Sequence, residues 1–409
     1  MKKNIAFIKF GGMSTGGTEK VLQTIASELP KDKYNVDFFY CDSAPYVGSD
    51  YKHLDTELSR VEYCLKNNVN LIKFNVAFKD ITVPTHDWVD TNFWDYFKEE
   101  NYDVILTGRA GHPEYPFSLI RNTKIIDTIH LSGMAENKVN VYKTVLISNK
   151  QREQWIKAGG PRKKSIIIPN PVNVIVTNKK YIFENKFVFG LHQRNDDYIF
   201  SEIPLMSYQK IENENTLFLI LGGSSKYKEQ ASSLKIKNIK FFPTTSDINV
   251  IHKFLNSLDV YAHGRKDGEQ CSTAIIEAMS HGLPIISHKA PSMGHAEQIG
   301  DAGLIAGNIE EYTLAMKKFM YDQPFYNDKS IISKLRYKSI YSIDSIMEQY
   351  INLIEEVIKA RKINYFDKII NIVVNFYLKI KKILKTSYYK NLFVKLIFKL
   401  VKKLKPKIN

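Results

Sequence analysis

The feature that most constrains the fold of this chain is a repeated alternation of short apolar runs with helical segments. In the first half, apolar runs over 4–10, 35–40, 103–106, 124–129 and 144–147 are separated by longer stretches, several of which place apolar residues at helical spacing. Strands that alternate with helices are typical of parallel βαβ units, in which helices cover the faces of the sheet. We therefore expect an α/β domain with a parallel sheet.

The alternation stops once and then begins again. Pro169, Asn170 and Pro171 break it, and a polar stretch follows. We predict two domains of similar size, 1–175 and 176–339, and a helix over 340–360 that crosses back to the first domain. The second domain is indicated by further apolar runs over 187–190, 217–221, 239–242, 260–262 and 284–287.

The positive charge of the chain is concentrated at its C-terminus. The sequence holds 58 Lys and Arg against 43 Asp and Glu, a formal net charge of +15, and residues 361–409 contain 14 of the basic residues but a single acid, Asp367. Over 392–404, lysines fall on one helical face and bulky apolar residues on the other. This pattern predicts a basic amphipathic tail, 361–409, that lies on an anionic membrane surface. The alternatives are a nucleic-acid-binding arm and a helix packed on the body.

Cysteine usage and hydropathy indicate the compartment. Cys41, Cys64 and Cys271 form no CxxC and no Cys/His ligand spacing, which argues against a disulfide framework or structural zinc. No run reaches the roughly 18–20 apolar residues of a spanning helix, and the run after Lys3 is too short for a signal peptide. We therefore expect a cytoplasmic protein.

A glycine-rich loop follows the first predicted strand. It reads GGMSTGGTEKVL over 11–22. Glycines let the backbone approach a ligand, and the N-terminus of the following helix favours an anion. The spacing is not G-x-G-x-x-G, so the dinucleotide fingerprint is not met. A tight turn without a ligand is the alternative.

Two glutamates, Glu269 and Glu277, are separated by seven residues in DGEQCSTAIIEAMSHGLPIIS. Ser272 or Thr273 can cap a helix over about 274–281, which places Glu269 in the preceding loop and Glu277 one turn inside the helix. The two carboxylates would flank the positive helix end, where a phosphate would bind, and could accept hydrogen bonds from sugar hydroxyls. A capped helix with two solvent-facing acids is the alternative.

This segment resembles the E-x7-E region of the retaining, nucleotide-sugar-dependent glycosyltransferases with the GT-B fold, specifically glycosyltransferase family 4 (glycosyl transferases group 1). The resemblance covers about 3–350 and rests on seven blocks in the family's order: GGTEKVL, LISNKQREQW, IPNPVN, LILGG, SLDVYAHGRKDGE, EAMSHGLPIIS and GHAEQIGDAGLI. It implies two Rossmann-like parallel-sheet domains facing a cleft, the first on the acceptor side and the second binding the nucleotide sugar.

The resemblance also implies roles for single side chains. Glu269 would contact hydroxyls of the donor sugar near the reacting carbon, and Glu277 would hydrogen-bond the ribose of the nucleotide. His130 matches a first-domain histidine that faces the cleft in relatives, with a purely structural role as the alternative.

Backbone groups would hold the diphosphate. The resemblance assigns its binding to the amides of Ser272, Thr273 and Ala274. Gly16 and Gly17 would let the first-domain loop approach the phosphate and the acceptor.

The chain departs from the family where the second domain begins. Relatives usually carry a Gly-Arg strand end and a nearby lysine, both of which neutralise the leaving diphosphate. The corresponding stretch here, FGLHQRNDDYIF, offers Arg194 as its only cation. Arg194 could act alone or with Arg265 or Lys266, which could equally be solvated loop charges. A subfamily with its own donor preference is suggested by His192, Asn195 and Asp196.

Taken together, the blocks predict a retaining, metal-independent, hexosyltransferase-like enzyme that needs no cofactor. It would move a sugar from a UDP- or GDP-linked donor to a glycan or lipid-linked acceptor. With the basic tail, we expect it on the inner face of the membrane, in bacterial synthesis of a surface polysaccharide such as lipopolysaccharide or capsule, with no nucleic acid partner. The alternatives are a non-catalytic glycan- or nucleotide-binding GT-B protein and a nucleotide-sugar epimerase.

Overall fold

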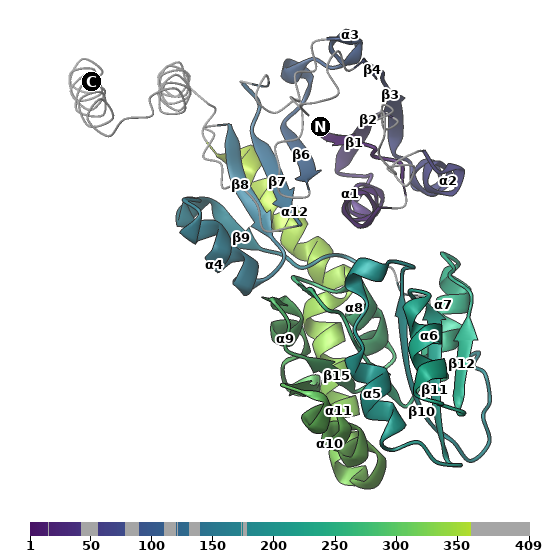
Figure 1. Cartoon of the computed structure of the whole chain (residues 1–409). Coiled ribbons are helices and arrows are strands. Elements are labelled where there is room, and N and C mark those ends of the chain that lie inside the picture. The colour runs from purple at the N-terminus through teal and green to yellow at the C-terminus, as the bar shows by residue number, and fades with distance from the viewer. Residues whose placement is uncertain are drawn as a thin grey trace, which may run out of the picture.

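The computed structural model describes residues 1–14, 16–41, 56–77, 90–109, 120, 122–130, 140–172, 174 and 178–360. These residues form two α/β domains, with one long helix running from the second domain back along the first (Figure 1). The predicted tail, 361–409, and part of the predicted junction near residue 175 lie outside the described residues.

The sheet of the N-terminal domain has seven strands, all parallel, in the order β3-β2-β1-β6-β7-β8-β9. Every apolar run predicted as a strand in this half is one. The short edge strands β3 and β9 were missed because they are mostly not buried and carry no continuous apolar run. The strands are β1 (Lys3–Phe10), β2 (Tyr34–Cys41), β3 (Asn70–Lys73), β6 (Val104–Arg109), β7 (Ile125–Ile129), β8 (Val141–Leu146) and β9 (Ser165–Ile167).

Helices flank this sheet. The predicted amphipathic helix behind the glycine loop is α1 (Gly17–Glu28), whose apolar residues Val21, Leu22 and Ile25 are buried against it. The other short elements of this domain are α2 (Leu58–Lys66), β4 (Val76–Ala77), β5 (Asp90–Thr91), α3 (Phe93–Tyr96), η2 (Glu99–Asn101), α4 (Asn149–Lys157) and η3 (Arg162–Lys164).

The sheet of the C-terminal domain has six parallel strands in the order β12-β11-β10-β13-β15-β17. All five predicted runs are strands here, and β17 was missed because it is short and begins at a glycine. The strands are β10 (Phe187–Gln193), β11 (Thr216–Gly222), β12 (Ile239–Phe242), β13 (Val260–Ala262), β15 (Ile285–His288) and β17 (Gly303–Ala306).

The remaining elements of this domain surround its sheet. A two-stranded ribbon of β14 (Gly268–Glu269) and β16 (Ser292–Met293) holds the loop that carries Glu269. The others are η4 (Asp197–Ile199), α5 (Ile203–Gln209), α6 (Lys226–Ser233), α7 (Ile248–Leu255), α8 (Thr273–Ser280), α9 (Gly294–Ile299), η5 (Gly300–Ala302), α10 (Ile309–Tyr321), α11 (Gln323–Arg336) and the π-helical turn η6 (Tyr337–Tyr341).

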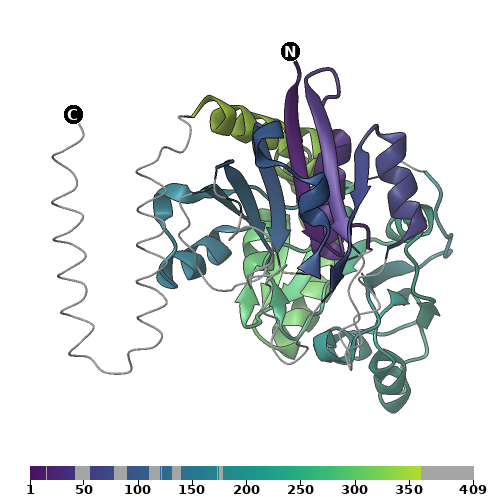
Figure 2. The same cartoon turned by 90° about the horizontal axis from the view of Figure 1, so that it is seen from above.

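The long helix α12 (Ile343–Lys359) lies beside the N-terminal sheet in both cartoon views (Figures 1 and 2). It begins at Ile343 rather than at residue 340, because the π-helical turn precedes it and the hydroxyl of Ser342 caps it. Its buried face, which includes Tyr350 and Ile354, belongs to the core of the N-terminal domain.

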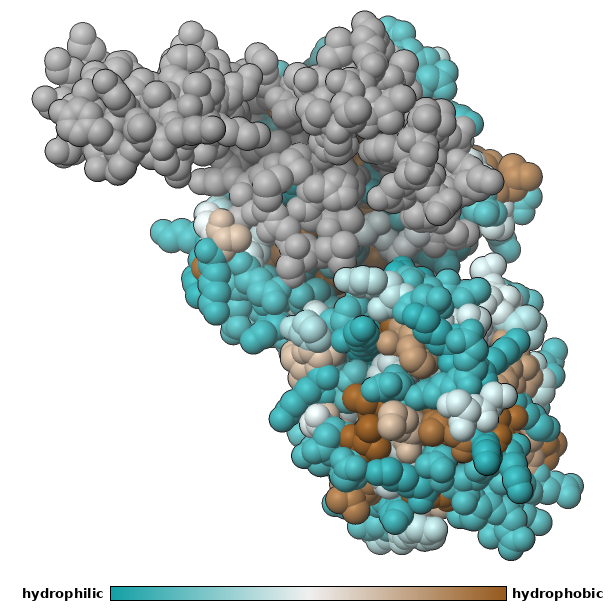
Figure 3. All heavy atoms as spheres, in the orientation of Figure 1, coloured by the Kyte–Doolittle hydropathy of each residue, from teal (hydrophilic) through white to brown (hydrophobic). Residues whose placement is uncertain are grey.

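The surface of the C-terminal domain is mostly hydrophilic on the face shown in Figure 3, with scattered apolar patches. Within the described ranges, no helix has both the length and the apolar character needed to cross a bilayer.

Candidate functional site

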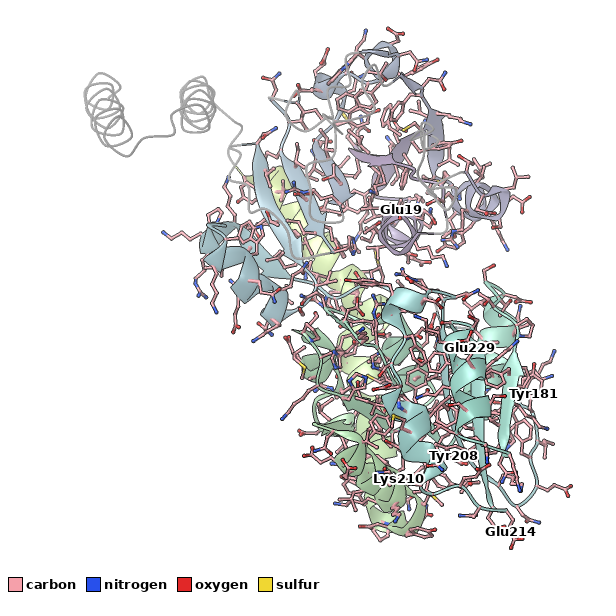
Figure 4. All side chains as sticks on the ribbon, viewed as in Figure 1. Glu19, Tyr181, Tyr208, Lys210, Glu214 and Glu229 are labelled. Carbon is pink, nitrogen blue, oxygen red and sulfur yellow. The ribbon has the colours of Figure 1, made fainter. Side chains whose placement is uncertain are left out.

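The predicted site residues lie at the carboxyl ends of parallel strands, where open α/β sheets bind their ligands. In the N-terminal domain, β1 leads through the glycine loop into α1, which lies at the edge facing the C-terminal domain (Figure 1). Figure 4 labels Glu19 on this helix. In the C-terminal domain, the strands β10 and β13 are neighbours, and histidines at their carboxyl ends contact Glu277 and Glu269, respectively.

Both carboxylate oxygens of Glu269 are engaged. Oε2 lies 3.0 Å from His263 Nε2, and Oε1 lies 3.0 Å from Arg265 Nη1. Arg265 also makes a two-point ion pair with Asp267, at 2.7 and 3.0 Å. Its side chain is only 20% exposed, so Arg265 is not a solvated loop charge.

These partners keep Glu269 ionised. Burial by itself would raise the pKa of this carboxyl, but the hydrogen bond and charge of His263, together with the charge of Arg265, lower it to about 2. At neutral pH Glu269 is therefore a hydrogen-bond acceptor and not a proton donor.

Histidines that the sequence analysis did not assign hold the Glu269 loop. His263 follows β13 directly, is buried, and has its Nδ1 2.8 Å from Ser287 Oγ. The backbone amide of Glu269 donates to His295 Nδ1 at 3.4 Å, and His295 Nε2 donates to the carbonyl of His288 at 3.0 Å. Both His263 and His295 stand in quoted sequence blocks, but only the fold shows that they face Glu269.

Glu277 lies inside α8 and is held by another histidine. Its Oε2 is 2.7 Å from His192 Nε2, and the two side chains are 18% and 11% exposed. The ring of His192 packs edge-on against Tyr261 on β13. Each glutamate of the predicted pair is therefore held by a histidine at the end of one of two adjacent strands.

The start of α8 offers free amides to an anion. Ser272 is its N-cap and accepts from the amide of Ile275 at 3.4 Å, as the sequence predicted for Ser272 or Thr273. The amide of Ser272 is itself used, because it donates to Gln298 at 2.8 Å. Among the described residues, the amides of Thr273 and Ala274 have no acceptor, as expected for the first turn of a helix.

The glycine loop is shaped by a buried ion pair beneath it. Lys9 and Glu19, each 4% exposed, lie 3.2 Å apart, and Thr18 donates to Glu19 at 2.7 Å. A side chain at Gly16 would overlap with the Glu19 carboxylate, whereas a methyl group at Gly17 would meet nothing within 4 Å. Of the two predicted glycines, only Gly16 is therefore required by close contact.

His130 lies in the same region, after β7. Its amide donates to the carbonyl of Arg109 at 2.9 Å, and burial lowers the pKa of its imidazole to about 4. Its Nε2 is buried without a partner among the described residues. Asn170, which interacts with His130, donates to the carbonyl of Cys271 at 3.5 Å and so links this cluster to the start of α8.

The cations near the site are mostly paired. Arg194 is 66% exposed and makes two hydrogen bonds to Asp196, at 2.7 and 3.0 Å. Lys20, on the first turn of α1, is exposed and close enough to Glu277 to interact with it electrostatically. Desolvation and the charge of Arg60 lower the pKa of Lys20, and Glu277 opposes the shift. Sequence reasoning missed Lys20, because its position opposite Glu277 depends on how the two domains face each other.

An open cavity of about 570 Å³ lies beside the Glu269 loop. Acidic, basic and aromatic side chains surround it. They are Asp197, Tyr198, Lys226, Lys266 and Asp267, together with Pro291. Within the described part of the chain, no group of three or more His, Cys, Asp or Glu side chains is arranged to hold a metal ion.

The comparisons with known proteins agree with this geometry. The profile of the family described as "Glycosyl transferases group 1" matches residues 194–335. An uncharacterized glycosyltransferase of Haemophilus influenzae is 23% identical over 360 residues, covering 85% of this chain and 99% of that protein.

Two solved structures share the fold. Anabaena HepE in complex with UDP and glucose superposes with a TM-score of 0.62 at 16% identity, over 86% of this chain and 99% of that one. The lipopolysaccharide outer core galactosyltransferase WaaB superposes with a TM-score of 0.61 at 16% identity, with the same coverage.

Two facing parallel-sheet domains are the architecture of the GT-B glycosyltransferases, the fold that these solved structures share with this chain. The chain matches the glycosyl transferases group 1 family over residues 194–335 and is similar to glycosyltransferases over most of its length. It is therefore an enzyme that transfers a sugar from a nucleotide-sugar donor.

Proposed function

We propose that this enzyme transfers a hexose from a UDP- or GDP-linked donor to a glycan or lipid-linked acceptor, with retention of the anomeric configuration. The proposed setting is synthesis of a bacterial surface polysaccharide. WaaB, which shares the fold, is a lipopolysaccharide outer core galactosyltransferase, and HepE was solved with UDP and glucose. The basic tail would hold the enzyme on the inner face of the membrane, where a lipid-linked acceptor is found.

One observation carries the proposal: Glu269 and Glu277 are both fixed by histidines beside the free amides of α8. We assign Glu269 to the hydroxyls of the donor sugar, Glu277 to the ribose, and the amides of Thr273 and Ala274 to the diphosphate. An ionised carboxylate accepts strong hydrogen bonds from hydroxyls, and a helix N-terminus favours phosphate.

The chemical step needs stabilisation of the departing nucleoside diphosphate. In the proposed mechanism, the glycosidic C–O bond to the diphosphate breaks while the acceptor oxygen bonds to the same carbon from the same face, and the proton of the acceptor hydroxyl passes to the departing phosphate oxygen. The negative charge that develops on the diphosphate is offset by the α8 amides, Arg194 and Lys20, without a covalent nucleophile. Arg194 would have to exchange Asp196 for phosphate, and Lys20 would supply charge from the N-terminal domain.

The test is a donor panel with the purified full-length chain in anionic lipid–detergent micelles. We expect one UDP- or GDP-sugar to release its nucleotide slowly alone and faster with a membrane extract that supplies acceptor, and we expect the product to keep the donor's anomeric configuration by NMR. A chain ending after Ala360 should keep slow hydrolysis and lose the membrane stimulation. Inversion, or turnover of a donor to an epimeric nucleotide sugar, would contradict the proposal.

A further inference from the structure

His192 holds only one of the two carboxylate oxygens of Glu277. The contact joins His192 Nε2 to Glu277 Oε2 at 2.7 Å. Because a carboxylate only accepts, the proton of this hydrogen bond belongs to Nε2. Glu277 Oε1 has no hydrogen-bond partner among the described residues. Oε1 is therefore the oxygen that remains to accept a hydrogen bond from a ligand hydroxyl.

The position of His192 is itself fixed by a buried tyrosine. The hydroxyl of Tyr261, which is 1% exposed, donates to the His192 carbonyl at 3.1 Å and lies 3.4 Å from the His192 amide. The two rings meet edge to face, with centroids 5.5 Å apart and an interplanar angle of 68°. The imidazole thus has a set direction before any ligand binds.

Packing alone does not account for a histidine here. Its Nδ1 is buried and has no partner in the described part of the chain, so the hydrogen bond to Glu277 is the ring's one polar contact there. Burying a polar atom without a partner destabilises a fold, and an apolar ring at this position would avoid that cost. The contact with Glu277 is the feature that only a hydrogen-bonding side chain provides.

We propose that His192 is a positioning residue for the nucleotide: it aims Glu277 so that Oε1 accepts a hydrogen bond from a ribose hydroxyl. This inference rests on the proposed function, because it takes the ligand at Glu277 to be the ribose of the donor. His192 acts through Glu277 and touches no reacting atom. Through His192, the unusual FGLHQRNDDYIF stretch would take part in donor recognition, a role separate from that of Arg194.

The test compares ribonucleotides with their deoxy counterparts. Binding of UDP, GDP and their 2′-deoxy and 3′-deoxy forms is measured by calorimetry with the full chain and with the His192→Phe, His192→Gln, Glu277→Ala and His192→Phe/Glu277→Ala variants. Phenylalanine keeps the ring on Tyr261 but cannot donate, whereas glutamine places an amide donor near the position of the histidine Nε2. Thermal melting confirms that each variant is folded.

We expect the full chain to bind one ribonucleotide about tenfold or more tightly than its deoxy form, the usual effect of a hydrogen bond to a charged acceptor. His192→Phe should lower this ratio toward that of Glu277→Ala, the double variant should lower it no further, and His192→Gln should restore most of it. A folded His192→Phe protein that keeps the full ratio would overturn the inference while leaving the proposed function intact. If the full chain binds no UDP or GDP, the proposed function fails as well.

Discussion

Glu269 carries a charge that the fold stabilises, so the free energy of unfolding should depend on the pH range in which this carboxyl is protonated. The ordinary pKa of a glutamate is 4.5, and in the folded protein burial, opposed by His263 and Arg265, leaves the pKa of Glu269 at about 2. Because the folded value is the lower one, this stabilisation is complete above pH 4.5 and is lost as the pH falls toward 2. Within that window the group contributes about 1.4 kcal/mol per pH unit.

We therefore predict that the free energy of unfolding of the unmodified chain falls more steeply between pH 4.5 and 3 than that of Glu269→Gln. The difference between the two slopes should approach the value for the uptake of one proton, about 1.4 kcal/mol per pH unit. Urea unfolding at several pH values measures it. His263→Phe should bring the slope closer to that of Glu269→Gln. Without His263, less remains to counter the effect of burial, which raises the pKa of Glu269. Equal slopes for the unmodified chain and Glu269→Gln would show that Glu269 is not held ionised.

At the residue scale, the sequence could predict that Glu269 lies before α8 and Glu277 inside it, but not which residues hold them. The E-x7-E spacing and the capping serine are local in the chain, and they predicted α8 to within one residue at each end. Glu277 contacts His192, which lies 85 positions away in the sequence. Glu269 contacts His263 and His295, which lie 6 and 26 positions away. Such contacts depend on which strands are neighbours in the sheet, which apolar runs do not specify.

At the scale of elements, the glycine loop gives a matched pair of substitutions. Gly16→Ala would push against the Glu19 carboxylate, which is buried and paired with Lys9, so the loop or the ion pair must move. We predict a loss of about 1–3 kcal/mol in the free energy of unfolding, the usual cost of overpacking.

Gly17→Ala is the control for that stability measurement. It stands one residue later, at the start of α1, where a methyl group meets nothing within 4 Å. Since alanine favours helix, its melting temperature should stay equal to or slightly above that of the unmodified chain. Equal losses in the two variants would show that the Glu19 contact is not what requires Gly16.

Strands could be predicted from the sequence where they are buried along their whole length, and less well at the edges of the two sheets. The apolar runs identified ten strands of the two sheets, since buried parallel strands are apolar on both faces. The strands β3, β9 and β17 are short, and β14 and β16 pair over two residues each. The ribbon of β14 and β16, which positions Glu269, has no signature in sequence because it depends on the approach of the loop before α9.

At the scale of the whole molecule, Glu297 on α9 joins the two domains. Its carboxylate accepts from the Asn149 amide at 3.0 Å, from Asn149 Nδ2 at 2.6 Å and from the Lys150 amide at 3.1 Å. It therefore covers the N-terminus of α4 in the N-terminal domain, where a negative charge is favoured.

We predict that Glu297→Ala loosens this domain contact. Amide hydrogen exchange at Asn149 and Lys150 should become about tenfold faster, the effect of losing a hydrogen bond to a charged group. Glu153→Gln is the control, because Glu153 stands on α4 with Asn149 and Lys150, is 62% exposed and, among the described residues, pairs with the Lys150 side chain alone, at 3.8 Å. Unchanged exchange in Glu297→Ala would mean that the domains are held in place by other contacts.

We propose that Glu269, on the loop before α8, serves the transfer reaction. The most direct measurement is nucleotide release from the preferred donor by the unmodified chain, by Glu269→Gln and by Glu310→Gln, a control on an exposed surface ion pair. We predict that Glu269→Gln lowers kcat at least a hundredfold, while it still binds the nucleotide product and stays folded, and that Glu310→Gln matches the unmodified chain. A Glu269→Gln protein that releases nucleotide at the unmodified rate would contradict the account.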